Sequence, residues 1–160
     1  MKPGLPPRAR LLAIALALLA GIAFAISVQR GPWWAIGEAE VGPFGAQRCG
    51  GGTCAPAGLA WLGGGERWIR IGMATWAAGM IALVLLVVMA AAIAAKRVPR
   101  LVAKTVLVSI ATAGCTGGAL FAMFPGDEFP AATIQRGVWL FAIAIVLGTT
   151  SAIMVLRTKR

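Results

Sequence analysis

The side chains best suited to chemistry are Cys49 and Cys54, which enclose the run Gly50-Gly51-Gly52-Thr53. Glycine reaches positive φ without strain, so this run predicts a tight hairpin turn. Thiols that face each other across such a hairpin lie within bonding distance. The spacing therefore predicts a disulfide if the segment meets an oxidising compartment. Such a bond could be a structural staple or a redox pair, and we favour the staple.

Few other residues could support catalysis. The 160-residue sequence contains no His, no Tyr and only five Asp and Glu residues. Paired carboxylates are therefore scarce, and imidazole is absent as a general base or metal ligand. Cys115 falls within a long apolar stretch, where we expect it to act as a small apolar residue. We predict no catalytic, cofactor-binding or metal-binding residues, and hence no enzyme.

The elements that carry these residues are predicted to be transmembrane helices. Hydrophobic residues make up 59% of the chain and charged residues 12%, and the mean hydropathy is +0.86, which is typical of a membrane protein. Four stretches can cross about 30 Å of hydrocarbon as helices: residues 11–28, 68–95, 101–124 and 138–156. Between them lie outer loops at 29–67 and 125–137 and an inner turn at 96–100. The predicted fold is a single all-α membrane domain, 1–160: a four-helix transmembrane bundle with a small disulfide-stapled β loop outside.

The net charge of +10 is confined to the two termini and to the turn between the second and third spans with the start of the third span. These segments hold ten basic residues and no acidic ones: Lys2, Arg8, Arg10, Lys96, Arg97, Arg100, Lys104, Arg157, Lys159 and Arg160. The remaining segments hold five basic and five acidic residues and are neutral. This segregation follows the positive-inside rule and does not match a nucleic-acid-binding pattern. It predicts cytoplasmic termini, residues 29–67 outside, and basic segments that attract membrane lipids.

The first span has an alternative interpretation. A basic start, an apolar run and the triplet Ala23-Phe24-Ala25 also resemble a cleavable signal peptide. The apolar run extends to Val28, which is long for such a peptide, so we favour a retained span. The abundance of Ala, Gly and Arg suits a GC-rich bacterial genome, which predicts the bacterial inner membrane as the location.

Tryptophans gather near the outer edges of the spans, at Trp33, Trp34, Trp61 and Trp68, and Arg70 follows the last of them. Amphipathic indole rings anchor helices at membrane interfaces, and aromatic residues also anchor protein contacts. We therefore treat these five residues as candidates for contact with a partner or with the membrane interface.

This arrangement resembles the claudin group of tetraspan proteins. The shared features are four spans, a large first outer loop with an early tryptophan pair, a cysteine pair, and Arg67 or Arg70 at the entry to the second span. The resemblance implies a small antiparallel outer sheet stapled by one disulfide. Trp34 (or Trp33) would match the family's early tryptophan, Cys49 and Cys54 its disulfide, and Arg70 its arginine. The family's Gly-Leu-Trp before the first cysteine is replaced by Gly42-Pro43-Phe44-Gly45, so a paracellular role is not carried over.

Small residues recur within the last three spans. Glycines allow close approach of helix backbones, and we assign this packing role to Gly72, Gly79, Gly114, Gly117, Gly118 and Gly148. The alternative is that hydroxyl groups on the third span line a groove for a ligand. Ionisable residues are nearly absent from the spans, which disfavours proton-coupled transport and ion conduction.

The leading functional hypothesis is a non-enzymatic scaffold, adhesion protein or accessory subunit, self-associating or held in a membrane protein complex. One alternative is a transporter of small molecules or lipids that uses the third span. The other is a membrane thiol-disulfide oxidoreductase, which is disfavoured because the outer pair is not Cys-x-x-Cys and Cys115 lies too deep to resolve it.

Overall fold

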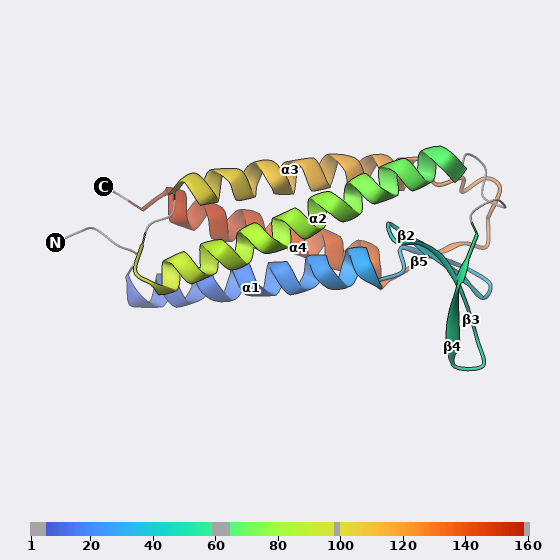
Figure 1. Cartoon of the computed structure of the whole chain (residues 1–160), viewed down its shortest axis with the longest axis horizontal. Helices are drawn as coiled ribbons and strands as arrows, with labels where there is room; N and C mark the ends of the chain where they lie inside the picture. Colours follow the sequence, from blue (N-terminus) through green and yellow to red (C-terminus); the bar gives the residue numbers. More distant parts are fainter. Residues whose placement is uncertain (1–5, 59–64, 98–99, 159–160) are drawn as a thin grey trace.

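The computed structural model describes residues 6–58, 65–97 and 100–158, and four long helices dominate it (Figure 1). They are α1 (Pro7–Gln29), α2 (Gly65–Ala94), α3 (Arg100–Ala122) and α4 (Arg136–Leu156). All four are long and apolar enough to cross a membrane. Each predicted span agrees with its helix to within four residues at either end. The predicted helical class is therefore confirmed, and the four apolar helices are compatible with an integral membrane protein.

The helices form a ring in which neighbours along the chain pack side by side. Helix α1 packs against α2 and α4, and α3 also packs against α2 and α4. Both described chain ends lie at one end of the bundle, together with the α2–α3 turn (Figure 1). We call this the basic end, because the described residues there include Arg8, Arg10, Lys96, Arg97, Arg100 and Arg157 and no acidic residue. The opposite end carries a small β-sheet and is called the sheet end (Figure 1).

The inner faces combine small and large apolar residues, and large aliphatic residues also cover the outer faces. On α1, Ala13, Ala17 and Ala20 are fully buried at the spacing of one helix face. Exposed aliphatic side chains occur on every helix, among them Leu19, Ile22, Val84, Val88, Val108, Ile143 and Val146. An apolar surface spread over all four helices is unfavourable in water and favourable in hydrocarbon.

Buried hydroxyl groups link the helices across the bundle. Ser151 Oγ on α4 donates to the carbonyl of Ala13 on α1 (2.8 Å). Ser109 Oγ on α3 donates to the carbonyl of Ala78 on α2 (3.4 Å). Because polar groups in hydrocarbon need a partner, such bonds fix the relative positions of helices that apolar packing alone would hold loosely.

Helix α2 ends where Lys96 adopts a φ of +58°. The N–H of Lys96 donates to the carbonyl of Ile93 (3.0 Å). The N–H of Arg97 donates to the carbonyl of Ala92 (3.0 Å). These bonds satisfy carbonyls of the last turn in the pattern that usually places glycine at the left-handed position. Residues 98–99 of the predicted inner turn lie outside the described residues.

Five short antiparallel strands form the sheet: β1 (Trp34–Ile36), β2 (Ala39–Gly42), β3 (Gly45–Gly50), β4 (Thr53–Ala57) and β5 (Thr133–Ile134). Their order is β4-β3-β2-β1-β5. Each strand from β1 to β4 is joined to the next by a two-residue turn. In the turn between β3 and β4, Gly51 and Gly52 have φ values of +59° and +83°. Both values suit the tight hairpin that the glycine run predicts.

The fifth strand was not predicted, because residues 125–137 were expected to be a loop. Trp34 of β1 faces Ile134, and Ala35 faces Thr133. This pairing joins the segment between α3 and α4 to the segment between α1 and α2. It also makes the sheet a joint product of two segments about a hundred residues apart in sequence.

Candidate functional site

The predicted disulfide between Cys49 and Cys54 is present. The two residues face each other on β3 and β4 with their Cα atoms 4.1 Å apart. That spacing belongs to the non-hydrogen-bonded pairs of an antiparallel ladder. Cys49 is half-buried and Cys54 is exposed. The bond therefore joins two strands at the outermost hairpin of the molecule (Figure 1).

Glu40 and Cys115 bear on the question of thiol or metal chemistry. A carboxylate oxygen of Glu40 lies within 4.8 Å of both disulfide sulfurs. The sulfurs are bonded to each other, so neither is available as a thiolate ligand. Gln47 Nε2 donates to the same carboxylate (2.6 Å). Cys115 lies seven residues before the end of α3, on a different element from the disulfide. Nothing in this arrangement favours a thiol shuttle over a staple.

The disulfide is expected to stabilise its hairpin locally. Replacing Cys49 and Cys54 together by serine should lower the local stability of β3 and β4 by about 2 kcal/mol, because the closed loop is short. Hydrogen exchange of the β3 and β4 amides should then accelerate about thirty-fold, while exchange in the four helices stays unchanged. If the reduced wild-type protein exchanged as slowly as the oxidised protein, the staple role would be rejected.

Three of the candidate tryptophans are buried inside the protein. The exposed fraction is 1% for Trp33, 3% for Trp34 and 2% for Trp68. Trp61 lies outside the described residues. Arg70 is exposed and forms a surface ion pair with Glu66 (3.6 Å). Most of the surface of these three rings is therefore covered by the protein itself, and their role in contact with a partner stays a prediction.

These tryptophans form an aromatic junction between the sheet and the bundle. Trp34 stacks on Phe124, with ring centroids 4.6 Å apart and an interplanar angle of 4°. Its ring also meets Phe121 at 5.5 Å and the edge of Trp68 at 5.3 Å. Trp33 packs against Phe141 of α4 at 5.0 Å. Because these rings come from β1, α2, α3 and α4, the junction fixes the sheet relative to the helices.

A polar seam accompanies the aromatic junction. The indole N–H of Trp33 donates to Ser27 Oγ (3.2 Å), and Ser27 Oγ donates to the carbonyl of Gly137 (2.7 Å). The N–H of Gly137 donates to the carbonyl of Pro32 (2.9 Å). The seam joins the end of α1, the start of β1 and the start of α4. It was missed because its members are far apart in sequence.

Four of the six candidate packing glycines lie at close contacts. A Cβ atom on Gly79 would lie 2.9 Å from Val28 Cγ1, one on Gly117 2.5 Å from Phe141 Cε1, and one on Gly148 2.7 Å from Ile110 Cδ1. A Cβ on Gly72 would lie 3.0 Å from the carbonyl oxygen of Pro43, which shows that α2 runs beside the β2–β3 turn. Gly114 has only an ordinary contact, and Gly118 faces open space.

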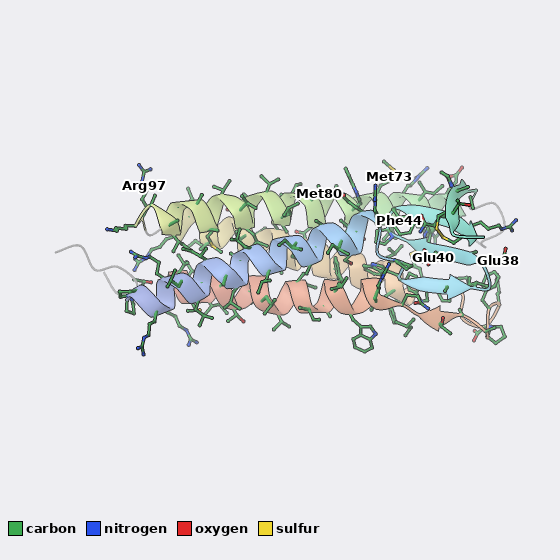
Figure 2. All side chains as sticks on the ribbon, turned by 90° about the horizontal axis from the view of Figure 1, so that it is seen from below. Glu38, Glu40, Phe44, Met73, Met80 and Arg97 are labelled. Carbon is green, nitrogen blue, oxygen red and sulfur yellow. A yellow bond between two sulfur atoms is a disulfide. The ribbon has the colours of Figure 1, made fainter. Side chains whose placement is uncertain are left out.

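A hollow opens on the surface where α2 meets the sheet. Its volume is about 430 Å³, and the residues that line it include Pro43, Phe44, Ala46, Pro56, Ile69 and Met73. Ile69 and Met73 are 45% and 64% exposed, although both are apolar. Figure 2 shows Phe44 and Met73 together at the sheet end, opposite Arg97 at the basic end. We call this the outer hollow.

The sequence contained one signal for the outer hollow that was not used. Ile69 and Met73 are four residues apart and therefore share a face of α2. Helix α2 has 30 residues, or about 45 Å, which exceeds the ~30 Å of a hydrocarbon core. Its first turns lie beside the sheet, as the close contact of Gly72 with Pro43 shows.

Among the described residues β4 is the outermost strand on its side of the sheet, and its Pro56 and Ala57 border the outer hollow. Pro56 faces Gln47 two positions beyond the disulfide pair, so it also occupies a non-hydrogen-bonded position. Its missing N–H therefore falls on the free edge, where proline commonly blocks pairing with another strand. A partner is thus better accommodated by side-chain contacts in the outer hollow than by addition of a strand to β4.

The chain matches no protein-family model, and no curated protein matches it significantly.

Proposed function

We propose that this chain is a non-enzymatic accessory or scaffold subunit that binds another membrane protein at the outer hollow. The observation that carries the proposal is the exposure of Ile69 and Met73 beside a hollow built from sheet and helix residues. Apolar residues that line a concave surface are the usual core of a protein contact. The disulfide adds a rigid wall, because it holds β4 against β3.

Charge supports one orientation for this subunit. The segregated basic residues belong to the basic end, so we place that end and both termini in the cytoplasm and the sheet outside. In a bacterium this arrangement corresponds to the inner membrane, with the outer hollow facing the periplasm. An oxidising compartment on that side is also what the Cys49–Cys54 bond requires.

We also propose that the chain shares the claudin-like layout. An antiparallel sheet stapled by one disulfide, with Trp34 in its first strand, supports this proposal. The layout alone assigns no activity, because a fold hosts many functions and function depends on the site. The partner is therefore described by its chemistry: a membrane protein with an apolar segment at the membrane surface.

Site-specific crosslinking in the native membrane tests the proposed contact. A photoreactive benzoylphenylalanine at Phe44 should capture one partner of constant mass, because Phe44 lines the outer hollow. The same probe at Ile134, an exposed residue of β5, serves as the positional control. Adding Met73→Arg should lower capture about ten-fold, since a charge in an apolar contact costs more than 1 kcal/mol.

The matched control for the charge is Ala131→Arg, which adds the same side chain at another exposed position of the sheet end. Capture through Phe44 should be unchanged by Ala131→Arg. Lipid adducts alone, or equal loss with both arginine variants, would reject a protein contact at the outer hollow. An adduct of two copies of the chain would indicate self-association and contradict the accessory role.

A further inference from the structure

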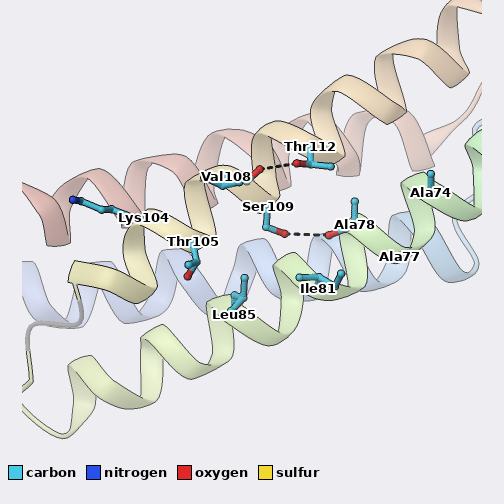
Figure 3. A pocket seen from close by; sticks show the side chains of 10 residues that line it. All are labelled: Ala74, Ala77, Ala78, Ile81, Leu85, Lys104, Thr105, Val108, Ser109 and Thr112. Atoms are coloured by element: carbon cyan, nitrogen blue, oxygen red, sulfur yellow. Dashed lines mark hydrogen bonds between the residues drawn. The ribbon is translucent and has the colours of Figure 1, made fainter.

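A second concave surface lies along the bundle, between α2 and α3 (Figure 3). It is a groove of about 560 Å³, which we call the α2–α3 groove. Its walls consist mainly of alanine and branched aliphatic side chains, among them Ala77, Ile81 and Val108. Val108 and Ile81 are exposed, so the groove opens toward the surroundings of the bundle. The short side chains of successive alanines on α2 leave this space unfilled.

The hydroxyl groups in the α2–α3 groove already have partners. Thr105 Oγ1 donates to the carbonyl of Val102 (2.8 Å), and Thr112 Oγ1 donates to the carbonyl of Val108 (3.0 Å). Ser109 Oγ is bonded to the carbonyl of Ala78 across the groove floor (Figure 3). Their donors are therefore used within the protein, which favours an apolar occupant over a polar solute.

The length of the groove matches one leaflet of a bilayer. On α3 it extends from Lys104 to Thr112, about 12 Å along the helix, and on α2 from Ala74 to Leu85, about 17 Å. Half of the hydrocarbon core of a bilayer is about 15 Å. A single acyl chain lying in the groove would therefore span the leaflet on the side of the basic end.

One charged residue lines the groove at that end. Lys104 is exposed, and its side chain extends from α3 toward the basic end, away from the other groove residues (Figure 3). The sequence has no acidic residue between Glu66 and Asp127, so neither α2 beyond its first turn nor α3 supplies a carboxylate to Lys104. Lys96, Arg97 and Arg100 belong to the same end and add positive charge. The groove is thus apolar along its length and cationic at its mouth.

We propose that the α2–α3 groove binds an acyl chain of an anionic phospholipid, whose phosphate pairs with the ammonium group of Lys104. An apolar chain fits the walls, and a negative headgroup complements Lys104 and the neighbouring basic residues. The occupant is a lipid of the leaflet at the basic end. The proposal does not depend on the partner proposed for the outer hollow, because the two surfaces share no lining residue and Lys104 belongs only to the groove.

Photoreactive lipids in vesicles containing the full-length protein test this site. Two vesicle samples are compared, both made mainly of phosphatidylcholine. One contains a small fraction of phosphatidylglycerol with a diazirine in its acyl chain, and the other contains the same fraction of phosphatidylcholine with that label. Labelled positions are mapped by mass spectrometry. Within the groove, phosphatidylglycerol should label about five times more than phosphatidylcholine, the preference that one well-placed basic residue gives.

Two pairs of variants separate the headgroup contact from the groove. Lys104→Gln should bring the ratio of phosphatidylglycerol to phosphatidylcholine labelling close to one. Lys96→Gln changes a residue outside the groove lining and should preserve most of the preference for phosphatidylglycerol. Ala77→Phe should lower groove labelling by both lipids, whereas Ala15→Phe on an exposed face of α1 should not. Equal groove labelling by the two lipids, or a preference that survives Lys104→Gln, would overturn the proposal. If Ala77→Phe does not fold, the two lysine variants still decide it.

Discussion

Replacement of Trp34 by alanine is expected to lower the free energy of unfolding by about 4 kcal/mol, within the range for a buried tryptophan truncated to alanine. Trp34 is 3% exposed and stacks on Phe124 while its ring meets Trp68 edge-on. Its removal would leave a cavity at the aromatic junction and remove several ring contacts together. The sheet should then loosen from the bundle, with the helices retained.

Unfolding of the purified protein in mild detergent, followed by circular dichroism, measures this loss, and limited proteolysis reports on the sheet. Trp139→Ala is the matched control, because Trp139 is 64% exposed on α4. That variant should change the stability by less than about 1 kcal/mol. A Trp34→Ala protein as stable and as protease-resistant as Trp139→Ala would contradict the role of the aromatic junction.

Gly137→Ala is expected to lower the free energy of unfolding by about 3 kcal/mol, a large effect for the addition of one methyl group. The added Cβ would lie 2.5 Å from the carbonyl oxygens of both Gly31 and Pro32, and 2.7 Å from Trp33 Cδ1. Backbone carbonyls cannot rotate away as a side chain can, so the start of α4 must move. That movement would also disturb the bond from Ser27 Oγ to the carbonyl of Gly137.

The control for this substitution is Gly118→Ala, since a Cβ at Gly118 meets nothing within 4 Å. Alanine favours helix more than glycine does, so this variant should be neutral or more stable by up to about 1 kcal/mol. Unfolding titrations of both variants in the same detergent give the comparison. Equal stabilities for the two alanine variants would show that the seam between α1, β1 and α4 is not closely packed.

Much of the fold could be predicted because its signals are local. Apolar runs of membrane-spanning length predict α1 to α4, although α1 begins at Pro7, four residues before the predicted span, because proline suits the first position of a helix. The glycine run between Cys49 and Cys54 predicts a hairpin and its disulfide. In each case neighbouring residues determine the outcome, so no knowledge of distant contacts is needed.

The candidate surfaces could not be predicted in the same way. Tryptophans near the ends of spans occur both at membrane interfaces and in protein interiors, and the residue type does not distinguish the two. Trp34 is buried because Phe121 and Phe124, almost ninety residues later, cover it. The outer hollow likewise needs the β2–β3 turn beside α2, and the α2–α3 groove needs a particular helix pairing.

The sequence by itself determined the four apolar helices, the segregation of basic charge and the disulfide-closed hairpin, because hydrophobic length, charge and glycine conformation act within short segments. Only the tertiary structure decided that β5 completes the sheet, that three tryptophans are buried at the aromatic junction, and which glycines lie in close contact. Those features depend on pairings between segments separated by tens to about a hundred residues. Local patterns do not specify such pairings, because packing complementarity arises only when the helices and strands are assembled.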